Sequence, residues 1–185
     1  MLRCNVVVTA NCSIEVLAYS EYRGECTTPR IGHVKMDGDV VWHGSWCTNF
    51  CDHLGVNTLL IDPFTCSVLQ SRRFDTSAYG LPNTATELSN YLQTLDNDSV
   101  IVGVTAGEPA YKLPSALPTL RQFAVEVADL ERGGSFAFIA QKGYPVKTVL
   151  SKVLTMTESN TSPAGFNAVI TGSILAQNKC RNLPV

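Results

Sequence analysis

The chain has 185 residues, of which 45% are hydrophobic and 16% are charged, and its formal net charge at pH 7 is −2. This composition is typical of a globular protein long enough to bury a core without a structural metal. The small net charge and the lack of a long basic run argue against nucleic acid and anionic lipid as partners. The longest apolar runs, residues 100–106 and 136–140, are too short to cross a bilayer, so no membrane insertion is expected.

The seven cysteines are the most informative feature of the composition. Their number favours an oxidising compartment, in which cysteines pair into disulfides. Three Asn-x-Ser/Thr sequons, at Asn11, Asn97 and Asn160, agree with passage through the secretory pathway. The sequence therefore predicts a protein that is secreted or lies on the extracellular face of the cell surface. The disulfide candidates are Cys4, Cys12, Cys26, Cys47, Cys51, Cys66 and Cys180.

The pairing of these cysteines stays open at this point. An odd number leaves one thiol free or bridging two chains, so a disulfide-linked or non-covalent homo-oligomer is one expectation. Residues 1–4 lack the charged-then-apolar pattern of a signal peptide. We therefore expect a mature or excised segment that carries an added methionine.

Turn residues at intervals of roughly eight to twelve positions predict antiparallel strands in the N-terminal half. The Asp37-Gly38 pair is a strong indication of a hairpin. The nearly continuous apolar run at 56–61 predicts a strand that is buried on both faces. The strands predicted in this half are residues 5–9, 13–20, 30–36, 40–43, 56–62 and 67–74.

The middle of the chain changes to a helical period. Thr84 and Glu87 have the spacing of a capping box, and apolar residues at helical spacing behind them predict a helix that ends near Asp96. A second helix is expected at about 115–124, with Pro118 near its first turn. Further strands are predicted at 99–105, 135–139, 146–154 and 167–170. This order predicts one α+β domain over residues 1–185, in which two helices cover a mostly antiparallel sheet system.

The segment from His43 to His53 holds zinc-ligand residue types, with Cys47 and Cys51 between the two histidines. Among so many other cysteines, disulfides are the favoured interpretation, and no cofactor is expected. Cys47, His43 and Asp52 could be imagined as a nucleophilic site, but no triad or metal motif supports that geometry. We therefore expect that the chain is not an enzyme.

Acidic residues stand at several turns and strand ends. The turns at 37–39 and 96–98 could offer oxygen ligands to calcium, but neither has the spacing of a calcium loop, and turn geometry is the favoured explanation. Asp62 and Asp75 each follow a predicted strand, where a carboxylate can accept a backbone N–H. A structural role is expected for both.

Five pieces of the sequence follow a known family pattern in order and spacing. They are Gly-Val-Asn-Thr-Leu-Leu-Ile-Asp-Pro-Phe-Thr at 55–65, Arg-Phe-Asp-Thr at 73–76, a Glu-bearing helix at 87–95, the strand 100–104 and the block 135–143. Together they resemble the interleukin-like EMT-inducer and pancreatic-derived-factor (ILEI/PANDER) domain, a lectin-like module. The same module occurs in the stem of protein O-mannose N-acetylglucosaminyltransferase and in cell-surface hyaluronidases.

The resemblance covers about residues 31–149, and strands within 1–30 and the tail 156–185 are expected to pack on that block. It implies a compact ββα, sandwich-like fold stapled by disulfides, secretion and no intrinsic catalysis. In the transferase stem the module binds β-linked N-acetylglucosamine, whereas other members are cytokine-like or hormone-like secreted proteins. The resemblance also places Cys66 where the family has a hairpin glycine, which implies a disulfide there, and it favours Cys4 or Cys12 as the partner of Cys180.

The residues of the sugar pocket carry over only in part. The stem has an Arg before the glycine of the first strand, and that position is Leu54 here. Glu108 matches an acidic position after the strand at 100–104, and Arg132 stands one place earlier than the corresponding Arg of the stem. The resemblance therefore implies that a bound sugar would contact Glu108 and Arg132, with Tyr111 or Phe136 nearby.

Three functions follow as expectations. The first is a lectin-like module that binds glycans or glycoproteins, of the N-acetylglucosamine type or other cell-surface sugars, in a cleft with an acid, an Arg and an aromatic ring. The second is a cytokine-like or hormone-like factor that binds protein through an exposed apolar patch. The third is a structural accessory domain of an extracellular enzyme. Trp42 and Trp46 could serve as sugar platforms, but burial of such rings beside a disulfide is favoured.

Overall fold

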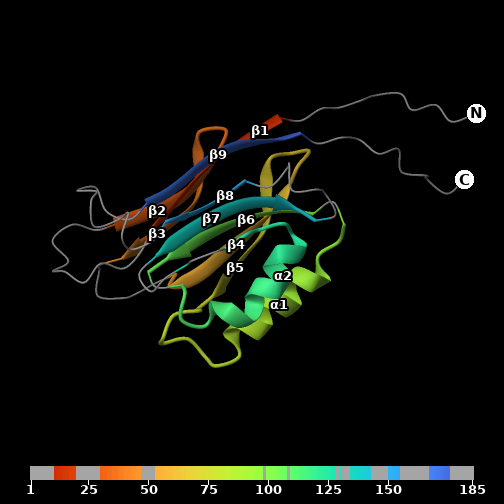
Figure 1. The fold of residues 1–185 in the computed structure, drawn as a ribbon. Coiled ribbons are helices and arrows are strands. Elements are labelled where there is room, and N and C mark those ends of the chain that lie inside the picture. The colour runs from red at the N-terminus through yellow and green to blue at the C-terminus, as the bar shows by residue number, and fades with distance from the viewer. Residues whose placement is uncertain are drawn as a thin grey trace, which may run out of the picture.

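A computed structural model describes residues 11–19, 30–46, 53–97, 99–107, 109–127, 130, 134–142, 150–154 and 167–175. Over these residues, two antiparallel sheets lie face to face and helices cover the outer face of the larger sheet (Figure 1). The sheet of order β3-β2-β1-β9 consists of β1 (Asn11–Tyr19), β2 (Arg30–Met36), β3 (Asp39–Trp46) and β9 (Asn167–Leu175). The sheet of order β5-β4-β6-β7-β8 consists of β4 (Gly55–Asp62), β5 (Ser67–Phe74), β6 (Val100–Ala106), β7 (Ser135–Gln141) and β8 (Leu150–Leu154).

The first apolar core fills the space between the two sheets. Alternate residues of β1 point into it, since side chains on a strand alternate between its faces. Ile14 and Val16 of β1 are fully buried there against Val102 of β6 and Leu59 of β4. β6 is buried along its whole length, because the smaller sheet covers one of its faces and the helices cover the other. This confirms that the apolar runs of the larger sheet are two-sided core strands.

The second core lies between the larger sheet and the helices. The helical layer consists of α1 (Thr84–Thr94), the 3₁₀ turn η1 (Leu113–Ala116) and α2 (Leu117–Gln122). Leu88 and Leu92 of α1 and Leu120 of α2 are fully buried against the sheet. The predicted second helix therefore exists as a 3₁₀ turn followed by a short α-helix, with Pro118 in the first turn of α2 where it is tolerated.

The α+β fold and the positions of the strands are confirmed over the described residues, whereas the capping box is wrong. Asn83, not Thr84, is the N-cap of α1, and the helix begins one residue earlier than the capping box requires. Glu87 instead accepts a hydrogen bond from the side-chain amide of Asn83, at 2.7 Å. The predicted strand at 5–9 lies outside the described residues, as does the start of the strand predicted at 146–154.

Cys12 and Cys66 form a disulfide with a Cα–Cα distance of 5.6 Å. The pairing confirms the expectation of a disulfide at the hairpin position that a glycine holds in the family. It also corrects the expectation that Cys12 is available to Cys180, because its sulfur is already bonded. The other disulfide candidates, which lie outside the described residues, are Cys4, Cys26, Cys47, Cys51 and Cys180.

The remaining sequence predictions concern turns, tryptophan burial and metals. Asp62 accepts the backbone N–H of Phe64 at 2.8 Å, which confirms its structural role. Trp42 is buried and meets the ring of His53 edge-on, with the ring centroids 5.6 Å apart. Nowhere in the described ranges do three or more His, Cys, Asp or Glu side chains gather as a metal site. None of the helices there is long and apolar enough to span a membrane.

Candidate functional site

The sequence-predicted sugar residues have different fates in the structure. Glu108 and Arg132 lie outside the described residues. Phe136 is fully buried in β7 and stacks on Phe138 with the ring centroids 5.9 Å apart, so the expectation that its ring meets a ligand is corrected. Tyr111 is 62% exposed, as a ligand contact requires.

Three strand ends meet at the end of the larger sheet from which the Tyr111 segment leaves. Gly55, which begins β4, pairs with Ala106 at the end of β6, and Val56 pairs with Phe74 at the end of β5. The loop that follows β5 and the segment that follows β6 therefore start side by side. Leu54, where the glycan-binding stem has an arginine, directly precedes Gly55 at this end of the sheet.

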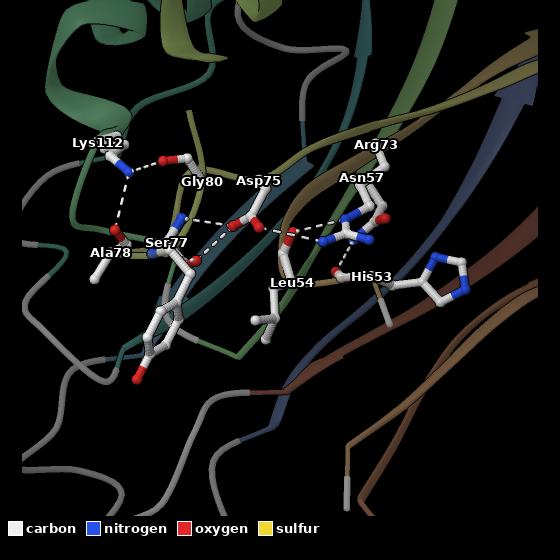
Figure 2. Close-up of polar contacts among 10 residues, drawn as sticks. His53, Leu54, Asn57, Arg73, Asp75, Ser77, Ala78, Gly80 and Lys112 are labelled. Atoms are coloured by element: carbon white, nitrogen blue, oxygen red, sulfur yellow. Dashed lines mark hydrogen bonds and ion pairs between the residues drawn. The ribbon is translucent and has the colours of Figure 1, made fainter. Parts of the chain in front are cut away.

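The loop after β5 is fixed by its own side chains, as Figure 2 shows. Asp75 accepts hydrogen bonds from both the backbone N–H, at 3.1 Å, and the hydroxyl of Ser77. The Ser77 hydroxyl oxygen in turn accepts the backbone N–H of Tyr79 at 3.2 Å. A Cβ on Gly80 would lie 1.6 Å from the carbonyl oxygen of Asp75, so the tight loop requires glycine there.

Lys112 joins this loop to the segment that carries Tyr111. Its ammonium donates to the carbonyl oxygen of Ala78, at 3.0 Å, and to that of Gly80 (Figure 2). Its backbone N–H donates to the carbonyl oxygen of Thr76 at 2.9 Å. Three bonds from one residue thus hold the two segments in one relative position.

Large side chains project from this fixed backbone into solvent. Tyr79 is 84% exposed, Leu81 is 66% exposed and Tyr111, beside Lys112, is also open. We call these three residues the tyrosine edge. Exposed rings on a rigid frame contribute little to folding, but they offer a partner a surface that loses little entropy on binding.

Arg73 lies near the end of β5, just before the loop that carries Tyr79. Its guanidinium donates to a carboxylate oxygen of Asp75 at 3.2 Å and to the carbonyl oxygen of Leu54 at 3.4 Å (Figure 2). Leu54 itself is buried and packs so closely on Gly107 that a Cβ there would lie 2.3 Å from its side chain. At the position where the glycan-binding stem has an arginine, Leu54 makes this apolar contact, and its carbonyl oxygen accepts the bond from Arg73.

A cavity of about 540 Å³ lies next to this edge, between β5 and α1. Its lining combines guanidinium, carboxylate, amide, hydroxyl and aromatic groups. The lining residues are Arg72, Arg73, Phe74, Glu87, Asn90, Tyr91 and Thr94. The guanidinium of Arg72 lies 4.7 Å from the centroid of the Tyr91 ring, and burial raises the pKa of the Tyr91 hydroxyl. Sequence reasoning missed this cavity, although the helical spacing of Glu87, Asn90 and Thr94 places them on one face of α1.

The comparison with known families decides the identity of this part of the chain. Residues 54–144 match the family model described as interleukin-like EMT inducer. The chain carries a domain of this family. The match confirms the resemblance over its central part, from β4 to β7, and the interleukin-like EMT-inducer domain is at family level a non-catalytic, cytokine-like or lectin-like module. No curated protein shows significant similarity to the chain.

Both the tyrosine edge and the cavity lie within the matched segment. They consist of two loops held together by Lys112 and a polar cavity beside the edge strand β5.

Proposed function

We propose that the protein is an extracellular lectin-like module that binds glycans at the tyrosine edge and leaves them chemically unchanged. The observation that carries the proposal is the presentation of Tyr79 and Tyr111, both strongly exposed, on two segments fixed to each other by Lys112. Apolar C–H faces of sugars stack on aromatic rings, and a ring that is already in place costs little entropy to use.

In this proposal, charged groups close to Tyr79 and Tyr111 in the sequence supply the directional contacts that a sugar needs. Arg73 uses two of its N–H groups within the protein, and the guanidinium has five. The remaining donors can bond hydroxyl or acetamide oxygens, and the other partner of the site would be Glu108, which precedes Tyr111 in the chain. A carboxylate that accepts two hydroxyls fixes the orientation of a sugar ring.

A cytokine-like function is the second candidate, and Leu81 is the observation that favours it. This aliphatic side chain is exposed beside the two tyrosines and has no hydrogen-bonding group to offer a sugar. An exposed apolar patch with aromatic neighbours is typical of protein-binding surfaces. The same surface would then hold a protein receptor.

A glycan array with the purified protein, presented multivalently because single lectin sites bind weakly, tests the first candidate. Tyr79→Ala and Tyr111→Ala should each lower the affinity for the best glycan about 10-fold, equivalent to about 1.4 kcal/mol. Val40→Ala, at an exposed position of β3 in the other sheet, is the matched control and should bind as the wild type does. Wild-type protein that retains no glycan above background would contradict the proposal and leave the protein-binding candidate.

A further inference from the structure

We infer that the cavity between β5 and α1 is a subsite for the acidic group of an anionic sugar, one that bears a carboxylate or a sulfate. The inference deepens the glycan-binding function proposed above and rests on it. Its site is distinct from the tyrosine edge, and it assigns a ligand class to residues that the family resemblance did not single out.

The cavity is open, of suitable size and built from two elements. At about 540 Å³ it falls within the range of roughly 300–1,000 Å³ that is typical of small-ligand sites. One wall is the end of β5, which is the edge strand of the larger sheet among the described strands. The other wall is the face of α1 that carries Glu87, Asn90 and Thr94. A ligand can therefore enter from the side of the sheet.

Arg72 is the group that points to an anion. Its guanidinium is held over Tyr91 and, with the Gln70 amide turned so that its oxygen faces the guanidinium, donates to that oxygen at 3.2 and 3.3 Å. Within the described part of the chain, no carboxylate lies within ion-pair distance of Arg72. The guanidinium is thus oriented by neutral groups and keeps its charge uncompensated. Such a planar fork matches the two oxygens of a carboxylate or sulfate.

The other lining groups favour a sugar over a polyanion. The free charges of the lining are the guanidinium of Arg72 and the carboxylate of Glu87, because Arg73 is ion-paired with Asp75. One acidic group can therefore pair with Arg72, whereas a run of acidic groups would meet the carboxylate of Glu87. One oxygen of Glu87 accepts from Asn83, which leaves its other oxygen and the amide of Asn90 for hydroxyl groups. A ligand with one acid and many hydroxyls fits this combination.

The cavity and the tyrosine edge are connected by the end of β5. Arg73, at that end, is among the residues lining the cavity, and it is followed two residues later by Asp75, the first residue of the loop that carries Tyr79. An oligosaccharide could therefore place an acidic sugar beside Arg72 and a neighbouring neutral sugar against the tyrosine rings. Binding to the two sites would then be separable by mutation.

The test measures binding of sialylated and sulfated oligosaccharides and of their neutral counterparts by calorimetry. We expect the wild type to bind at least one acidic form about 10-fold more tightly than its neutral form, and the preference should weaken with added salt. Arg72→Gln should abolish the preference, and Arg72→Lys should keep part of it, because the charge stays but the fork is lost. Arg121→Gln, at an exposed position of α2, is the matched control. Thermal melting of each variant checks that it folds. If Arg72→Gln does not fold, the comparison of Arg72→Lys with the wild type still decides the test.

Each outcome decides between the two proposals. The subsite is overturned if the wild type shows no preference for acidic oligosaccharides, or if Arg72→Gln retains that preference. In either case, binding of neutral oligosaccharides that is lost in Tyr79→Ala still supports the tyrosine edge. If binding of acidic oligosaccharides is lost in Arg72→Gln but unchanged in Tyr79→Ala and Tyr111→Ala, the subsite is supported and the tyrosine edge is overturned. No binding of any glycan overturns both, and an acidic peptide that displaces the sugar from the cavity overturns the sugar class. The stronger of the sialylated and sulfated arms identifies the acid group.

Discussion

Cys12 of β1 is bonded to Cys66 in the turn between β4 and β5, so one covalent bond ties together the two sheets of the sandwich. Cys66 adopts a positive φ of 54°, which usually favours glycine, and its backbone N–H donates to the carbonyl oxygen of Asp62 at 2.9 Å. Cys66 therefore has an unfavourable backbone conformation in the position from which its sulfur links the two sheets.

Removal of this crosslink should lower the stability of the protein substantially. The two cysteines are 54 residues apart, and a loop of that length implies a loss of about 4 kcal/mol for Cys12→Ala with Cys66→Ala. Urea unfolding of the variant and the wild type measures the difference. Cys12→Ala with Cys66→Gly is the control and should lose about 1 kcal/mol less, because glycine relieves the turn. An unchanged unfolding midpoint would show that the bond does not restrain the unfolded chain.

The stability should also depend on acid through Glu15. Hydrogen bonds from Lys35 and, secondarily, His33, each at 2.7 Å, lower the pKa of Glu15 from its ordinary value of 4.5. A carboxyl group with a lowered pKa stabilises the fold above its unfolded pKa and loses that contribution as the pH falls through the lowered value. The melting temperature should therefore fall more between pH 6 and pH 3 in the wild type than in Glu15→Gln. The same pH dependence in both proteins would speak against the contribution of Glu15, and Glu126→Gln serves as the exposed control.

Lys112→Met should loosen the tyrosine edge without removing a tyrosine. The variant loses the bonds to Ala78 and Gly80, so we expect a several-fold lower glycan affinity and faster amide exchange across residues 76–81. Lys142→Met is a close match, because Lys142 makes the same kind of bonds to the carbonyl oxygens of Gln93 and Leu95. It should lose similar stability and keep the affinity. Equal losses of affinity in both variants would assign the effect to global stability.

Asn97 should carry an N-linked glycan when the protein is made in secretory cells. It is exposed in the turn after α1, and its sequon is completed by Ser99. In the sequon at Asn11, by contrast, the middle residue is the buried, disulfide-bonded Cys12. Mass spectrometry with and without amidase treatment should show one glycan fewer in Asn97→Gln and no change in Asn11→Gln. An unaltered mass in Asn97→Gln would refute this assignment.

The sequence predicted the strands well because their apolar residues are long runs with clear turns between them. Asp37 and Gly38 both have positive φ values, as the hairpin cue required, and β5 has the predicted bounds. The start of α1 was less predictable, because Thr84 and Asn83 are both good N-cap residues and the choice depends on tertiary packing. In the structure Thr84 is buried as the first residue of the helix, and Asn83 takes the N-cap position.

The binding residues were harder to predict, because they depend on which face of a strand each side chain occupies. The pairing of β4 with β5 shifts between Leu60 and Ile61, so Leu69 is an extra residue on β5. Val68 therefore packs into the core between the sheets, whereas Arg72 reaches Tyr91 on the helical side. A one-residue insertion exchanges the faces, and no sequence pattern shows it. Phe136 was misplaced for a related reason, since both faces of β7 are covered.

The segment that matches the family covers only one of the two faces of the larger sheet. Residues 54–144 include the helices that shield one side of the larger sheet, but the strands that shield the other side come from before residue 47 and after residue 166. A protein trimmed to the matched limits would leave Leu59, Val102 and Ile139 in contact with water, which invites self-association. The flanking strands are therefore as necessary for a usable fragment as the matched segment itself.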